Sequence, residues 1–193
     1  MQSNILLSPL PTTITICGAE YEIDTDFRTA IRFTQLMQRA DVDDVTKLDI
    51  AIFMFFGAAP LPDLQEAVAR IMQFYRCGKD IKKTTGKAVE MAQRIYDYEY
   101  DADLIYAAFL EQYGLDLQDI PYIHWWKFRA LFSGLSEQTE FLKIVGYRAI
   151  KITDSMTKEQ KQHYRALKAQ YALPDNRSEE EKDRAFACSL ASV

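Results

Sequence analysis

Two glycine–lysine pairs are the first residues whose type and spacing suggest chemistry, because such pairs occur in phosphate-binding loops. They are Gly78-Lys79 and Gly86-Lys87. A P-loop needs a glycine, four residues and then Gly-Lys-Ser/Thr, so that backbone amides surround the phosphates and the hydroxyl meets magnesium. Position 81, where the first glycine should stand for the second pair, is Ile81, and Ala88 follows the lysine. Both pairs are therefore predicted to lie in a solvated linker.

A run of alternating acids resembles a calcium-binding loop. It consists of Asp97, Glu99, Asp101 and Asp103. The glycine that turns such a loop is replaced by Ala102, and the position of its bidentate carboxylate is occupied by Ala108. The acids are instead predicted to lie at the N-terminus of a helix, where each stabilises the helix dipole by about 0.3–1 kcal/mol.

Histidines and cysteines offer no set of metal ligands. His124 and His163 are the only histidines, neither has a partner at ligand spacing, and both are predicted at the surface or its boundary. Cys17, Cys77 and Cys188 are far apart and form no CxxC pair, so neither a disulfide framework nor a structural zinc site is expected. We therefore predict no metal, no cofactor and no enzymatic activity; an enzyme built on scattered carboxylates is the alternative left open.

Composition narrows the class of protein further. The chain has 193 residues, of which 48% are hydrophobic, and its net charge of −5 disfavours a general nucleic-acid-binding protein. The longest apolar run, residues 50–56, is far shorter than the roughly 20 residues that span a bilayer. No membrane or nucleic-acid partner is expected.

Charge is unevenly distributed along the second half of the chain. Residues 97–119 contain seven acids and no Lys or Arg, whereas residues 143–168 contain seven Lys or Arg against two acids. Two solvated faces are the favoured interpretation. Intramolecular pairing and an oriented docking surface are the alternatives.

The N-terminal residues show the alternation of a β-hairpin. Apolar residues alternate at Ile14 and Ile16, Gly18 offers a turn, and Tyr21 and Ile23 resume the alternation. The pattern predicts a short hairpin that ends before an N-cap at residues 24–26.

Helical spacing of apolar residues predicts that the remainder is mainly α, with about seven or eight helices. The segment at 45–56 is apolar nearly all round, so it is predicted to be a buried central helix, with a buried strand as the alternative. The other expected helices lie at 25–39, at 64–75, at 99–113, at 119–133, after a Ser136 cap, after the Thr157-Lys-Glu-Gln160 capping box and from Ser178. The stretch that ends at about residue 96 is an optional further helix.

These elements suggest a domain organisation. Residues 1–24 form an N-terminal extension, residues 25–173 a helical domain with an internal linker at 79–87, and residues 174–193 a C-terminal helical tail.

Both tryptophans of the chain lie in the segment at 120–134. Trp125 and Trp126 would point about 100° apart on a helix, so both cannot face the centre of one narrow stripe. A central core helix is the favoured interpretation. The alternative is a helix that also presents aromatic and Arg side chains, which are the residue types that anchor protein interfaces. The residues expected to bind a partner are Trp125, Trp126, Lys127, Arg129, Tyr147 and Arg148.

This segment also carries a resemblance to a known family. The stretch Ile123-His-Trp-Trp-Lys-Phe-Arg-Ala-Leu-Phe-Ser-Gly-Leu135 resembles the signature of the bacteriophage gene-product-fifteen family. Further agreement lies at Asp26-Phe-Arg-Thr-Ala-Ile31, Tyr106-Ala-Ala-Phe-Leu-Glu-Gln-Tyr-Gly114 and Tyr171-Ala-Leu-Pro-Asp-Asn-Arg-Ser-Glu-Glu-Glu-Lys182. It extends from about residue 20 to the C-terminus and is weakest at 79–96.

The resemblance implies a role in phage tail morphogenesis. Members are encoded in long-tailed phages of Gram-positive bacteria, just ahead of the tape measure gene, where tail assembly chaperones are usually found. It therefore implies a chaperone that binds the tape measure protein in the host cytoplasm and is absent from the finished tail. A structural tail-associated virion protein is the alternative. Other tail proteins and a second copy of the chain are further expected partners, and no catalytic residue is carried over.

Overall fold

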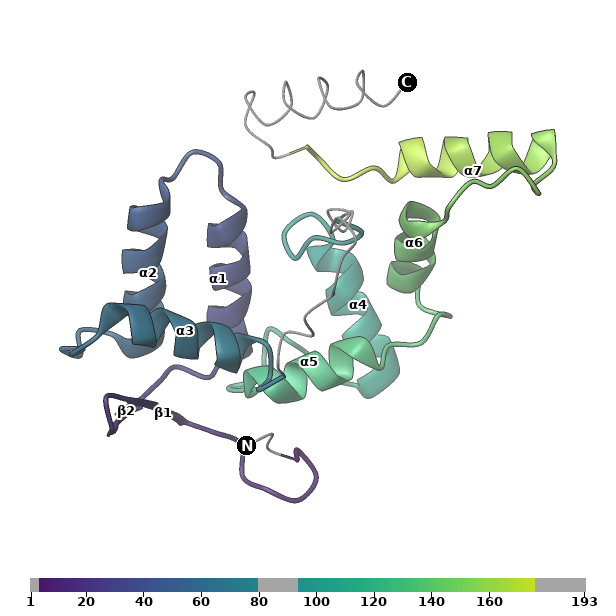
Figure 1. Cartoon of the computed structure of the whole chain (residues 1–193). Helices are drawn as coiled ribbons and strands as arrows, with labels where there is room; N and C mark the ends of the chain where they lie inside the picture. Colours follow the sequence, from purple (N-terminus) through teal and green to yellow (C-terminus); the bar gives the residue numbers. More distant parts are fainter. Residues whose placement is uncertain (1–3, 80–93, 176–193) are drawn as a thin grey trace. The chain divides into compact units, whose positions relative to one another are not determined.

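The structure is a computed structural model that describes residues 4–79 and 94–175 of the chain. The described residues divide into two units: residues 4–79 and Asp175 belong to unit 1, and residues 94–174 form unit 2. Among the described residues, unit 1 holds a hairpin and three helices, and unit 2 holds four helices (Figure 1). The mainly α fold with an N-terminal hairpin is thus confirmed. The helices expected before residue 96 and from Ser178 fall largely or wholly outside the described residues.

The hairpin is formed by β1 (Thr13–Ile16) and β2 (Ala19–Glu22), which pair in antiparallel orientation. Ile14 lies opposite Tyr21, and the side chains of Ile14 and Ile16 are buried. The two turn residues, Cys17 and Gly18, have φ angles of 48° and 81°. A two-residue turn with both φ angles positive matches the right-handed twist of the strands.

Unit 1 contains three helices, and an aspartate caps the N-terminus of each. They are α1 (Phe27–Gln38), α2 (Asp44–Phe56) and α3 (Leu64–Tyr75). The carboxylates of Asp26, Asp43 and Asp63 accept backbone amides of the first turn, which satisfies donors that have no partner inside a helix. In Figure 1, α1 and α2 run side by side and α3 crosses them, with β1 packed against α3.

An edge-to-face aromatic cluster fills the interior of unit 1. The ring of Phe55 on α2 lies 5.6 Å from Phe33 on α1 and 6.1 Å from Phe74 on α3, measured between centroids. The Tyr75 hydroxyl lies 2.8 Å from the Thr34 hydroxyl, which adds a polar contact between α3 and α1. The cluster joins all three helices.

Unit 2 is also built around aromatic rings. Its helices are α4 (Ala102–Tyr113), α5 (Trp125–Ser133), α6 (Glu140–Ala149) and α7 (Lys158–Gln170). Phe109 of α4 stacks on Phe128 of α5 with centroids 5.0 Å apart, and Phe132 of α5 lies 5.4 Å from Phe141 of α6. α7 packs on α6 and has no fully buried side chain.

Three helix starts in unit 2 differ from the sequence prediction, and the first is that of α4, which begins at Ala102 rather than near 99. α5 begins at Trp125 rather than near 119, because the Asp116 carboxylate holds the preceding residues in a turn and Pro121 disfavours helix in the residue before it. α6 is capped by Thr139 rather than Ser136, which instead opens the turn before the helix. The capping box predicted at Thr157 is present at the start of α7.

Candidate interaction surface

The two tryptophans are buried in the structure. The Trp125 ring stacks on Phe128 with centroids 5.9 Å apart, and the Arg129 guanidinium lies 5.5 Å from the centre of the same ring. Trp126 is also buried, whereas the next residue along the helix, Lys127, is exposed. The core interpretation of this segment therefore describes the structure better than an exposed aromatic patch.

His124 has a structural position that the sequence did not indicate. The prediction of a surface or boundary residue is wrong, because the side chain is buried at the N-terminus of α5. Its Nδ1 accepts a hydrogen bond of 3.0 Å from the Trp126 amide, which is the role usually taken by Ser, Thr, Asp or Asn at a helix start. His163, in contrast, is exposed.

Arg148 lies inside unit 2 and holds an ion pair with Asp101. Its two terminal nitrogens donate to the two carboxylate oxygens at 2.7 and 2.8 Å, and the side chains are only 4% and 1% exposed. The guanidinium also donates to the carbonyls of Ile95 and Tyr171, at 3.2 and 2.6 Å. Arg148 therefore connects three segments of unit 2 and does not present its charge to solvent.

This ion pair explains part of the uneven charge along the sequence. Asp101 belongs to the acidic stretch and Arg148 to the basic stretch, so intramolecular pairing is the correct interpretation at this point. Asp97 is buried as well: one oxygen accepts the Glu99 and Tyr100 amides, and the other pairs with Arg94 at 3.1 Å. Two of the four acids that resembled a calcium loop thus have structural partners.

The six residues expected to bind a partner do not form one exposed surface. Trp125, Trp126 and Arg148 are buried, whereas Lys127, Arg129 and Tyr147 reach solvent to different extents. Tyr147 stacks on Tyr171, with centroids 5.8 Å apart. The role of these residues in partner binding stays a prediction, but burial makes the first three unsuitable as surface anchors.

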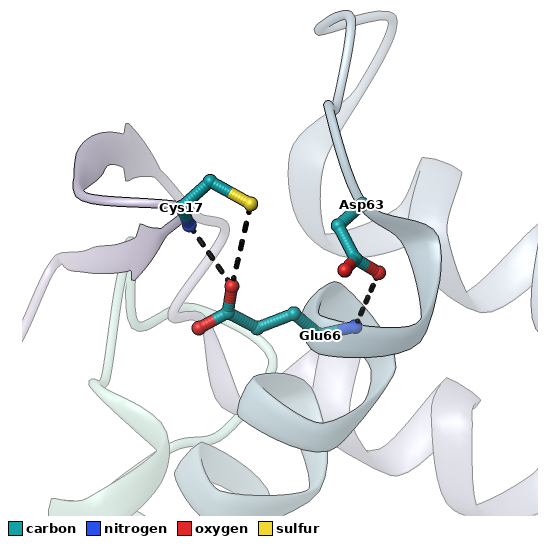
Figure 2. A group of neighbouring side chains, drawn as sticks. All are labelled: Cys17, Asp63 and Glu66. Atoms are coloured by element: carbon teal, nitrogen blue, oxygen red, sulfur yellow. Dashed lines mark hydrogen bonds between the residues drawn. The ribbon is translucent and has the colours of Figure 1, made fainter.

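A small polar cluster joins the hairpin to α3 (Figure 2). The Glu66 carboxylate accepts hydrogen bonds from the Cys17 amide at 2.9 Å and from its thiol at 3.6 Å, and Asp63 accepts the Glu66 amide. Partial desolvation and the neighbouring Glu66 raise the pKa of Cys17. The hydrogen bond from the Cys17 amide and the contact with Arg70 lower the pKa of Glu66.

The ligand atoms of this cluster lie within 4.8 Å of one another, a spacing that could suit a metal ion. The chemistry fits poorly, because a thiol with a raised pKa is a weak ligand and the other Glu66 oxygen already accepts Arg70 at 2.9 Å. The positive end of the α3 dipole also disfavours a cation at this place. The cluster is better explained as the connection that holds the strained turn residue Cys17 against α3.

α2 carries an exposed apolar face, contrary to the prediction of a buried central helix. Ala51 and Phe55 face the interior of unit 1, but Val45, Ile50 and Phe53 are 70%, 38% and 65% exposed. Among the described residues of unit 1, α2 packs mainly on α1 and α3, and neither of these helices covers Val45, Ile50 and Phe53. We call Val45, Thr46, Asp49, Ile50 and Phe53 the α2 apolar face, because helical spacing places them on one side.

Acidic residues surround and interrupt the α2 apolar face. Asp49 lies one helical turn from both Val45 and Phe53. Asp43 and Asp44 stand at the start of the helix, and hydrogen bonds from the Thr46 hydroxyl and amide lower the pKa of Asp43. Exposed apolar residues that are scattered singly need no explanation, but several on one face with polar neighbours are typical of interaction sites.

The chain matches the family described as Bacteriophage Gp15 protein over residues 6–173. The match covers most of the chain. The chain belongs to this family. Membership in the Gp15 family confirms the resemblance carried by residues 120–134, the tryptophan segment, and makes this a bacteriophage protein. Neither a curated protein nor a solved structure matches the chain significantly.

The Gp15 match includes described residues of both units, so the α2 apolar face and the buried ion pair of unit 2 both lie inside the matched range. No helix among the described residues is long and apolar enough to cross a membrane.

Proposed function

We propose that the chain is a tail assembly chaperone that binds the phage tape measure protein in the host cytoplasm and leaves before the tail is complete. The observation that carries the proposal is the exposed α2 apolar face in a member of the Gp15 family. The gene position implied by the family resemblance supports the same role. Helical clients commonly bind by laying an apolar stripe against an apolar surface of their partner.

Coating a long client places a condition on affinity. The chaperone has to cover the apolar stripes of the client and then dissociate as tube subunits arrive. Many repeated contacts of moderate affinity satisfy this condition better than one very tight site. Binding without catalysis or a cofactor is part of the proposal, and self-association along the client would add further contacts.

The six residues expected to bind a partner have two different roles in this proposal. Lys127, Arg129 and Tyr147 reach solvent, and we expect them to add contacts or to orient a partner. The buried residues Trp125, Trp126 and Arg148 act on binding only by holding α5 and α6 in place.

Co-expression with the tape measure protein of the same phage tests the proposal. We expect the tape measure protein to aggregate when expressed alone, and to stay soluble and co-purify with the chain when both are expressed. Quantitative mass spectrometry of purified virions should then find the chain in the infected lysate but not in finished particles.

A structural tail-associated protein is the alternative function. Its signature would be the chain in purified virions at a fixed ratio to the tape measure protein. Failure to co-purify, combined with presence in virions, would replace the chaperone proposal with this alternative.

A further inference from the structure

We infer that the α2 apolar face binds a helix whose apolar stripe is flanked by Lys or Arg. The inference deepens the proposed function, on which it rests, by naming the chemistry of the client segment and the surface that receives it. It is carried by the contrast between the two sides of α2 and by the charges around the exposed side.

The packing of unit 1 uses the inner side of α2 and does not require the exposed face. The inner side places Phe55 in contact with Phe33 and Phe74, and Phe56 lies against Tyr21 of the hairpin. Phe53 makes no comparable ring contact among the described residues and is 65% exposed. Removing its ring should therefore leave the core of unit 1 unchanged.

The shape of the face suits a helix. Val45, Asp49 and Phe53 form one row with a spacing of four residues, and Ile50 lies beside Phe53 in the next row. Rows of this kind form the ridges and grooves in which a second helix packs. A client helix would contact the face through residues at i, i+3, i+4 and i+7.

The charges select a basic helix. Asp43 and Asp44 adjoin the face and Asp49 is part of it, whereas the only basic residue of α2, Lys47, is largely buried and pairs with Asp44 at 3.7 Å. Asp49 has no ion pair within the described part of the chain. Its carboxylate is available to a Lys or Arg that flanks the client's apolar stripe, and such pairing fixes orientation more than it adds affinity.

Two other occupants fit less well. The α2 face of a second copy would bring Asp49 against Asp49, and like charges at an interface are unfavourable. The tail of the same chain, residues 176–193, contains four acids and three basic residues, so it offers no net positive charge. The basic helix of a client is therefore the occupant that the charges favour.

A pair of synthetic peptides tests the inference directly. Both are helical, about 14 residues long, and carry the same leucine stripe; one has Lys and the other Glu in the flanking positions. We expect the full-length chain to bind the Lys peptide about tenfold more tightly than the Glu peptide, as measured by fluorescence anisotropy at low salt. The preference should decrease at high salt, because screening weakens exposed ion pairs.

Substitutions assign the binding to the α2 apolar face. Phe53→Ser should weaken Lys-peptide binding about tenfold, and Val45→Ser provides a second variant if the first one folds poorly. Leu110→Ser is the matched control, since Leu110 is a 43% exposed apolar residue on α4 of unit 2. Asp49→Lys should reverse the preference so that the Glu peptide binds more tightly.

Overlapping fragments of the tape measure protein separate this inference from the proposed function. Both the inference and the proposed function are supported if fragments bind only when Lys or Arg flanks their apolar stripe and if these fragments do not bind the Phe53→Ser variant. If fragments bind equally well to the wild type, Phe53→Ser and Asp49→Lys, the chaperone role stands and the α2 inference is wrong. If the wild type forms a dimer that Phe53→Ser abolishes, the face binds a second copy and the inference is also wrong.

Discussion

Arg148 of α6 donates hydrogen bonds to both carboxylate oxygens of Asp101, the N-cap residue of α4, at 2.7 and 2.8 Å. These residues are 47 positions apart in the sequence, and both side chains are almost fully buried. The ion pair thus joins two helices of unit 2, and the additional bond from Arg148 to the Tyr171 carbonyl extends the connection to the end of α7. A buried pair of this kind is costly to break, because the remaining charge has no water to replace its partner.

Replacing Arg148 with Met should destabilise the protein strongly. The substitution leaves the Asp101 carboxylate buried without its cation, for which the expected loss is about 3–5 kcal/mol of unfolding free energy. Urea denaturation followed by circular dichroism measures the change. Combining Arg148→Met with Asp101→Leu should recover much of the loss, since neither charge then stays buried alone.

A surface pair provides the control for this prediction. Lys143 and Glu140 on α6 are 3.7 Å apart and both exposed, so Lys143→Met should cost less than about 1 kcal/mol. Equal losses for Arg148→Met and Lys143→Met would show that the Asp101–Arg148 pair does not contribute as the structure indicates.

The tryptophan segment should respond to substitution as a core element. Trp125→Ala removes a fully buried ring that stacks on Phe128, and we expect it to cost about 3–5 kcal/mol of unfolding free energy. Lys127→Ala changes an exposed residue of the same helix and should alter stability by no more than about 0.5 kcal/mol. Thermal and urea denaturation compare the two. A Trp125→Ala protein as stable as the wild type would show that Trp125 does not stabilise the core.

Much of the fold could be predicted from the sequence because its signals are local. The Asp26 cap, the turn at Gly18 and the capping box at Thr157 each act within a few residues, and the structure contains all of them. The apolar spacing of α1 and α3 likewise placed these helices within two residues of their observed bounds.

The features whose burial was predicted wrongly from the sequence depend on tertiary contacts, which no local sequence pattern contains. The periodicity of α2 shows that it is apolar all round, but not which of its sides α1 and α3 leave uncovered. The charge of Arg148 suggested a surface residue, and only the position of Asp101 in space explains its burial. A histidine N-cap is uncommon, so His124 would have been recognised only from the position of the helix start, which Pro121 and Asp116 determine.

His124 should be replaceable by Asn but not by Ala. Its Nδ1 accepts the Trp126 amide at the start of α5, and loss of an N-cap acceptor usually costs about 0.5–2 kcal/mol. The Asn side chain retains an acceptor at a similar distance from the backbone. Melting temperatures of the two variants make the comparison, with His163→Ala on exposed α7 as the control. An Asn variant as unstable as the Ala variant would mean that packing, rather than capping, decides this position.

The contact between Glu66 and Cys17 should make the hairpin connection sensitive to acid. The pKa of Glu66 lies below its ordinary value of 4.5, because its carboxylate accepts the Cys17 amide and pairs with Arg70. A depressed folded-state pKa means that the contribution to stability is fully present above about pH 4.5 and is lost as pH falls through the folded-state value. Urea midpoints of the wild type and Glu66→Gln should therefore differ most near neutral pH and converge in acid.

The same contact should slow the chemistry of the Cys17 thiol. Its pKa is raised by partial desolvation and by the adjacent Glu66 carboxylate, and the thiolate is the reactive form. In a chain with Cys77→Ser and Cys188→Ser, we expect iodoacetamide to modify Cys17 slowly at neutral pH despite the exposure of this residue. Glu66→Gln removes the neighbouring negative charge, so the pKa of the thiol should fall and alkylation should accelerate at the same pH. Unchanged alkylation rates would show that Glu66 does not contact Cys17 in solution, and the connection between the hairpin turn and α3 would then need another explanation.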